Sequence, residues 1–198
     1  MRNFEPGNLL QGSTLEVNNP QKSGLVIGNR IPKDYFITKG TGESDIAVHA
    51  GSYHLALKSA GIEMTNIMTY SSILPAIANK TEKPENIVHG SVMETIMAVS
   101  NGQMGERVSA GIIYGWLNNR NTGERYGGLV CEHNGNHTVN ELTDLLCASL
   151  NELYTNGFQE TYTLDDIEII TESFKPEKKY GSALVALCFT SYVIPIIN

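Results

Sequence analysis

The chain has 198 residues, of which 41% are hydrophobic and 18% are charged, and its mean hydropathy is −0.17. These values are typical of a soluble globular protein with a proper core, and no apolar run approaches the roughly 20 residues that span a bilayer. A net charge of −7 argues against a nucleic-acid or anionic-membrane partner. The amino terminus lacks the charged and apolar regions of a signal peptide, so we expect a cytoplasmic protein.

The cysteines and histidines do not form a metal-binding pattern. Cys131, Cys147 and Cys188 are widely spaced and include no CxxC pair, which predicts neither a disulfide framework nor a zinc site. His133 and His137 are four residues apart, but the residues between them form turns. The two imidazoles therefore do not share a helix face, and we predict no metal.

The amino-terminal third predicts an arm, a strand and a helix. Residues 1–30 are rich in Asn, Gly, Pro and Gln, which favours an arm or a loosely packed edge. Residues 34–38 predict the first strand, and an apolar stripe at steps of three and four predicts a helix over 46–60. Asp45 is the expected N-cap of this helix, and Gly61 is its expected stop.

The remainder of the chain is mostly strands. A second helix is predicted over 138–154, where Thr138 and Glu141 form a capping box. Strands are expected at residues 64–70, 87–99, 108–117, 126–132, 166–174 and 182–192. Because helices and strands do not alternate strictly, the order predicts an α+β layered sandwich, with residues 31–198 as one domain.

Two adjacent serines follow the strand that ends at Tyr70. Pro75 prevents regular pairing from continuing, so Ser71 and Ser72 lie at a sharp strand end. In an unusual backbone geometry, the Ser72 hydroxyl could attack the Ser71 carbonyl carbon and convert the amide into an ester. β-Elimination would then release Ser71 as a new carboxyl terminus and leave dehydroalanine at position 72, which hydrolyses to a pyruvoyl group. In the alternative interpretation, both hydroxyls only cap loose backbone groups.

Glu132 is a candidate general acid. It ends the apolar strand segment 128–131, where partial desolvation would let a carboxyl hold a proton near neutrality. The alternative is an ordinary surface acid at a strand end. A serine hydrolase is not indicated, because neither Ser71 nor Ser72 lies in a G-x-S-x-G elbow.

The segment from Asn66 through Ser71-Ser72 to Pro75 resembles the processing site of the pyruvoyl-dependent arginine decarboxylases, and the likeness is to the bacterial branch that includes the chlamydial enzyme. The resemblance extends from about residue 35 to residue 190. It is carried in order by Gly40-x-Gly42-Glu43-Ser44-Asp45, Ala56-Leu57-x-x-Ala60-Gly61-Ile62, His89-Gly90-x-Val92-x-Glu94, Gly127-Gly128 with Glu132, and Tyr180-Gly181-x-Ala183-Leu184.

The resemblance implies a fold, a processing event and an assembly. The fold is a four-layer αββα sandwich, and subunits form homotrimers or hexamers with active sites at the subunit interfaces. Self-cleavage gives a β chain, residues 1–71, and an α chain, residues 72–198. The α chain begins with a covalent pyruvoyl group made from Ser72, which serves in place of pyridoxal phosphate and without a metal.

The implied activity is decarboxylation of arginine to agmatine and CO₂ through a Schiff base with the pyruvoyl group. By the resemblance, Glu132 is the proton donor and the Asn66 amide polarises the Ser71 carbonyl. His54 stands where the family has an acid that contacts the guanidinium, so Asp45, Glu43 or a neighbouring subunit's acid must take over, or the substrate is another amino acid such as histidine. A further alternative is an unprocessed homologue that binds a small ligand or serves in assembly.

Overall fold

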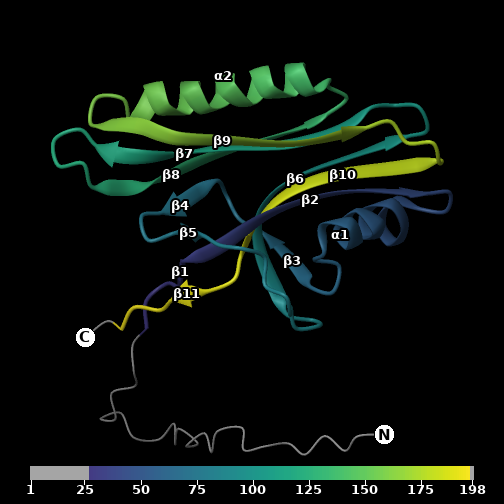
Figure 1. Cartoon of the computed structure of the whole chain (residues 1–198), viewed down its shortest axis with the longest axis horizontal. Helices are drawn as coiled ribbons and strands as arrows, with labels where there is room; N and C mark the ends of the chain where they lie inside the picture. Colours follow the sequence, from purple (N-terminus) through teal and green to yellow (C-terminus); the bar gives the residue numbers. More distant parts are fainter. Residues whose placement is uncertain (1–26, 197–198) are drawn as a thin grey trace, which may run out of the picture. The chain divides into compact units, whose positions relative to one another are not determined.

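The computed structural model describes residues 27–196 (Figure 1). Residues 30–193 form the main unit of the chain. In the second unit, the described residues are 27–29 and 194–196, which are joined by a bridge between Ile27 and Ile196. Most of the predicted amino-terminal arm, residues 1–26, lies outside the described residues and stays a prediction.

The main unit contains a five-stranded sheet with β10 at its centre. β10 (Tyr180–Phe189) is antiparallel to β6 (Val92–Gln103) on one side and to β2 (Asp34–Ser44) on the other. β3 (Asn66–Thr69) and β5 (Asn79–Lys80) are parallel edge strands. Residues 181–189 of β10 are all buried, as expected for the central strand of a sheet covered on both faces.

A four-stranded antiparallel sheet follows the order β4–β8–β7–β9. Its strands are β4 (Ile73–Pro75), β8 (Arg125–Gly135), β7 (Val108–Asn119) and β9 (Tyr162–Phe174). A separate ribbon pairs β1 (Ile31–Pro32) with β11 (Tyr192–Val193). The predicted strands therefore exist, with bounds that differ by up to six residues: β2 extends to Ser44, and β6 begins at Val92 rather than at residue 87.

One helix packs on each of the two larger sheets (Figure 1). α1 (His54–Ala60) packs on the five-stranded sheet through Ala56, Leu57 and Ala60, and α2 (Val139–Gly157) packs on the four-stranded sheet through three buried leucines, Leu142, Leu146 and Leu150. Thr138 and Glu141 form the predicted capping box of α2. Neither helix of the described part has the length and apolar character needed to cross a membrane.

The start of the first helix differs from the prediction. Residues 48–53 form a π-helical turn before α1, and Asp45 is not its N-cap, because the Ser44 hydroxyl accepts the Ile46 N–H instead. The wider turn breaks the 3.6-residue period. Ile46, predicted to be on the buried stripe, lies in the bend before this turn and is 89% exposed, while Ser52 is buried.

The largest apolar cluster draws residues from both sheets. Tyr35, Ile96 and Val185 of the five-stranded sheet share it with Ile112 and Tyr114 of the four-stranded sheet. Separate clusters lie under α1 and under α2. The predicted α+β class is confirmed.

The close approach of α1 to β2 generates a stability prediction. A Cβ on Gly42 would overlap the Ser52 carbonyl oxygen and the Ala56 backbone nitrogen. We expect Gly42→Ala to lower the free energy of unfolding by about 2–3 kcal/mol, because a backbone cannot yield as a flexible side chain can. Gly157→Ala is the control: it meets open space near the end of α2, and should leave stability unchanged or raise it by up to about 1 kcal/mol. Urea denaturation measures both, and equal stability of Gly42→Ala and the wild type would contradict the packing.

Candidate active site

The bond between Ser71 and Ser72 lies where the chain crosses from one sheet to the other. On one side, the Tyr70 N–H donates to the Thr95 carbonyl oxygen of β6 over 2.7 Å. On the other side, the Val130 N–H of β8 donates to the Ser72 carbonyl oxygen over 3.1 Å. The residues on either side of the exposed Ser71 are therefore each anchored to a different sheet.

A tight turn polarises the carbonyl at this bond. The Ile73 N–H donates to the Ser71 carbonyl oxygen over 3.0 Å, which closes a three-residue turn around Ser72. Among the described residues, Asp166 is the one non-glycine with a positive φ, so the turn contains no left-handed angle. A donor on the carbonyl oxygen also stabilises the charge that develops when the carbon is attacked.

The Ser72 hydroxyl donates to the Glu132 carboxylate, with 2.6 Å between Oγ and Oε2. Glu132 lies on β8 opposite Ile112, on the same face as Val130, which contributes to the cluster between the sheets. Both side chains are half-buried. A short hydrogen bond to a carboxylate is a geometry in which the hydroxyl proton can pass to the carboxylate as the hydroxyl attacks.

Asn66 lies at the opposite end of β3 from the two serines. Its side-chain amide donates to the Gly90 carbonyl oxygen over 2.9 Å. An extended strand of this length holds Asn66 about 16 Å from Ser71. Within one chain, the amide therefore contacts Gly90, and its action on the Ser71 carbonyl stays a prediction.

The expected guanidinium-binding residues lie at the far end of the five-stranded sheet. Glu43 pairs with Gly181, whereas the Tyr70 ring packs near Phe189, eight residues further along β10. This separation is about 26 Å at ~3.3 Å per residue. His54 begins α1, whose next residues contact Gly42 at the same end of β2.

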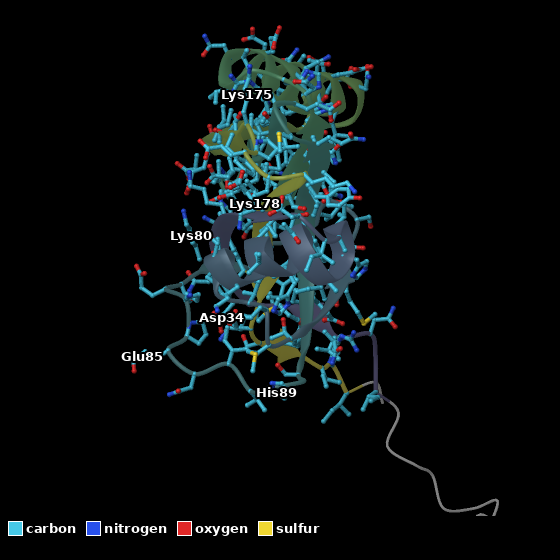
Figure 2. All side chains as sticks on the ribbon, turned by 90° about the vertical axis from the view of Figure 1, so that its right-hand side faces the viewer. Asp34, Lys80, Glu85, His89, Lys175 and Lys178 are labelled. Carbon is cyan, nitrogen blue, oxygen red and sulfur yellow. The ribbon has the colours of Figure 1, made fainter. Side chains whose placement is uncertain are left out.

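Both carboxylates at that end already bind backbone. Glu43 accepts the Glu177 N–H over 2.5 Å, and Asp45 accepts the Lys179 N–H over 3.2 Å. In Figure 2, Lys178 of the same loop lies above α1 and Asp34, at the start of β2, lies below it. One chain therefore brings Ser72 and Glu132 together, but does not bring Glu43, Asp45 or His54 to them.

The residues present fit a pyruvoyl group made from Ser72. Residue 72 is held to β8 by its carbonyl as well as by its side chain, and Glu132 lies within hydrogen-bonding distance. Two features of the site could not be predicted from the sequence: the hydrogen bond from the Ile73 N–H to the Ser71 carbonyl oxygen and the one from the Tyr70 N–H to Thr95. Both are backbone bonds that leave no mark in residue type. Within residues 27–196, no group of three His, Cys, Asp or Glu side chains is arranged to hold a metal.

Comparison with known proteins identifies the family of the chain. Residues 34–194 match the family model for pyruvoyl-dependent arginine decarboxylase. The chain belongs to this family. It is 30% identical to the pyruvoyl-dependent arginine decarboxylase of Methanopyrus kandleri, over 79% of this chain and 95% of that protein.

Other members of the pyruvoyl-dependent arginine decarboxylase family match over shorter segments. The protein of Methanococcoides burtonii is 39% identical over 42% of this chain, and that of Chlamydia pneumoniae is 32% identical over 55%. These alignments span 47% and 62% of the two relatives, so the first covers about half of its relative's length. The chlamydial match supports the expected bacterial likeness, and archaeal members are also similar.

The cysteine beside Glu132 offers a test of the local electrostatics. Burial, and secondarily the Glu132 carboxylate, raise the pKa of the Cys131 thiol to about 11. The neutral thiol therefore dominates at pH 8, where little of the reactive thiolate is present. We expect iodoacetamide to alkylate the exposed Cys147 first and Cys131 slowly, with a rate that rises toward pH 11. Peptide mass mapping measures the order, and fast alkylation of Cys131 at pH 8 in the folded protein would contradict it.

Proposed function

We propose that this chain cuts itself between Ser71 and Ser72 and then decarboxylates arginine to agmatine and CO₂. The observation that carries the proposal is the 2.6 Å hydrogen bond from Ser72 Oγ to Glu132, at a bond whose carbonyl oxygen already accepts the Ile73 N–H. Nucleophile, base and oxyanion donor therefore converge on one peptide bond.

In the self-cleavage, Glu132 accepts the hydroxyl proton as Ser72 Oγ attacks the Ser71 carbonyl carbon. The C–N bond breaks and an ester forms between Ser71 and the Ser72 side chain. Loss of the α-proton of residue 72 then expels the Ser71 carboxylate and leaves dehydroalanine. One water adds and one ammonia leaves, which gives the ketone. The Ile73 N–H stabilises the charge on the Ser71 oxygen during the attack.

In the decarboxylation, the pyruvoyl group supplies an electrophilic carbonyl that binds the substrate amine and accepts the electrons released with CO₂. Glu132 lies beside residue 72 and so can deliver a proton to the substrate α-carbon. The cluster between the sheets, where Tyr70 packs on Phe189, keeps water from one side of the site. Asn66 remains a proposed contributor, reached in an assembly rather than within one chain.

We further propose a four-layer αββα sandwich that assembles as a homotrimer or hexamer with active sites between subunits. Three separate apolar clusters, one under each helix and one shared by the two sheets, support the layers. The separation of about 26 Å along β10 between the site and Glu43 supports assembly, because a second copy could supply Glu43 and the groups near it. We propose a cytoplasmic location on the basis of the free cysteines and the acidic composition.

The substrate is tested by measuring CO₂ release from each of the basic amino acids and histidine. We expect arginine to be turned over fastest. Because a histidine cannot supply a permanent negative charge, His54→Asp should lower the KM for arginine if residue 54 of a second copy faces the guanidinium. Release of CO₂ from another amino acid, with none from arginine, would contradict the substrate assignment.

Replacing the nucleophile should stop the first reaction. We expect Ser72→Ala to remain a single chain with no decarboxylase activity, because no hydroxyl is left to attack the Ser71 carbonyl. Ser71→Ala is the matched control: it removes the neighbouring exposed hydroxyl and should still split. Denaturing electrophoresis distinguishes the two, and a cleaved Ser72→Ala protein would exclude Ser72 as the nucleophile.

Replacing the carboxyl group of Glu132 by an amide should impair turnover. We expect Glu132→Gln to lose about two to four decades of decarboxylation rate, the usual contribution of a general acid. The rate is expressed per cleaved chain, because the same variant also lacks the base for self-cleavage. Near-normal turnover per cleaved chain would show that another group protonates the product.

A further inference from the structure

A buried ion pair with no part in the chemistry above lies beside the crossing between the sheets. Glu94 of β6 is 3% exposed, and its two carboxylate oxygens both contact the Arg30 guanidinium. Arg30 Nε donates to Oε2 over 3.2 Å, and Nη2 contacts Oε1. The hydrogen bond to Oε2 fixes the orientation of the carboxylate, while the buried Oε1 accepts no hydrogen bond from the described residues. Arg30 precedes the proposed cut and Glu94 follows it, so the pair joins the two future chains.

Glu94 is next to the residue that anchors the cleavage site. The following residue, Thr95, accepts the Tyr70 N–H at its carbonyl oxygen. Glu94 of β6 lies opposite Phe189 of β10 in the sheet. The Tyr70 ring packs on the same Phe189, with 5.6 Å between the ring centroids. A shift of β6 at Glu94 is therefore transmitted directly to Tyr70, one residue before the bond that breaks.

Arg30, the other member of the ion pair, is connected to Tyr70 through Tyr192. The Arg30 guanidinium lies over the Tyr192 ring, 5.6 Å from its centroid. Tyr192 and Tyr70 both pack against the cluster between the sheets. The buried Tyr192 hydroxyl has no hydrogen-bond partner among the described residues. Its ring is thus positioned by packing and by Arg30 rather than by a hydrogen bond of its own.

We infer that the Arg30–Glu94 ion pair positions Tyr70, and through it the Ser71 carbonyl, for attack by Ser72. Arg30 and Glu94 are positioning residues, since neither touches the reacting atoms. The inference rests on the proposed self-cleavage between residues 71 and 72. The ion pair affects that reaction because the Ser71 carbonyl carbon must lie within a narrow range of distances from the Ser72 hydroxyl oxygen. A misplacement of about 1 Å can cost about a hundredfold in rate.

The two partners differ in exposure, which allows stability to be separated from positioning. The Arg30 side chain is 52% exposed and can be solvated without its partner, whereas a buried Glu94 carboxylate cannot. Arg30→Met should therefore lower the melting temperature more than Glu94→Gln does. The double variant has no unpaired charge, so its melting temperature should rise above that of Arg30→Met.

The test follows cleavage of freshly synthesised full-length chains by gel, together with the melting temperature of each protein. We expect Glu94→Gln, Arg30→Met and the double variant all to cleave about 10- to 100-fold more slowly than the wild type. Lys39→Gln is the control, because it breaks the Lys39–Glu172 ion pair, which lies away from residues 70–72, and should cleave at the wild-type rate.

The double variant decides between the two roles of the pair. Slow cleavage with a recovered melting temperature supports positioning. If the ion pair contributed only to stability, the cleavage rate would recover together with the melting temperature. Recovery of both, or wild-type cleavage by Glu94→Gln, would overturn the inference and leave the proposed function intact. A wild-type chain that never splits would instead overturn the proposed function, and this inference with it.

Discussion

The structure depends on one short crossing, in which Tyr70 is bonded to β6 and Ser72 is bonded to β8. At this crossing, Ser71 alone separates the residue bonded to the five-stranded sheet from the residue bonded to the four-stranded sheet. Because both neighbours of Ser71 are fixed by backbone hydrogen bonds, the peptide bond between residues 71 and 72 has little freedom to move. The two sheets thereby restrain the bond at which we propose cleavage.

The same arrangement explains how a broken chain would keep its fold. β2 belongs to the fragment before the cut, yet it pairs with β10 of the other fragment along ten residues. β3 pairs with β6, and β1 pairs with β11, in the same way. Loss of one covalent bond therefore removes little of what holds the two fragments together, and residue 72 stays fixed to β8 opposite its carboxylate partner.

Sequence patterns predicted the parts of this protein that depend on local chemistry. The capping box at Thr138 follows from residue type and spacing, whereas the roles expected of Ser72 and Glu132 came from the resemblance to a family. The π-helical turn could not be predicted, because Ile46 continued an ordinary helical stripe. The capture of the Glu43 and Asp45 carboxylates by backbone N–H groups 134 residues away, and the Ile73 N–H on the Ser71 carbonyl, arise from tertiary contacts and backbone geometry that no side-chain pattern records.

The central claim is that the chain converts its own residue 72 into the reactive carbonyl. Intact-mass measurement of the purified protein tests this directly. The account predicts two components, residues 1–71 with a free carboxyl terminus and residues 72–198 with a mass lower than the sequence value by one ammonia. A single chain of 21.7 kDa in the active protein, or a fragment 72–198 that retains an amino-terminal serine, would contradict it.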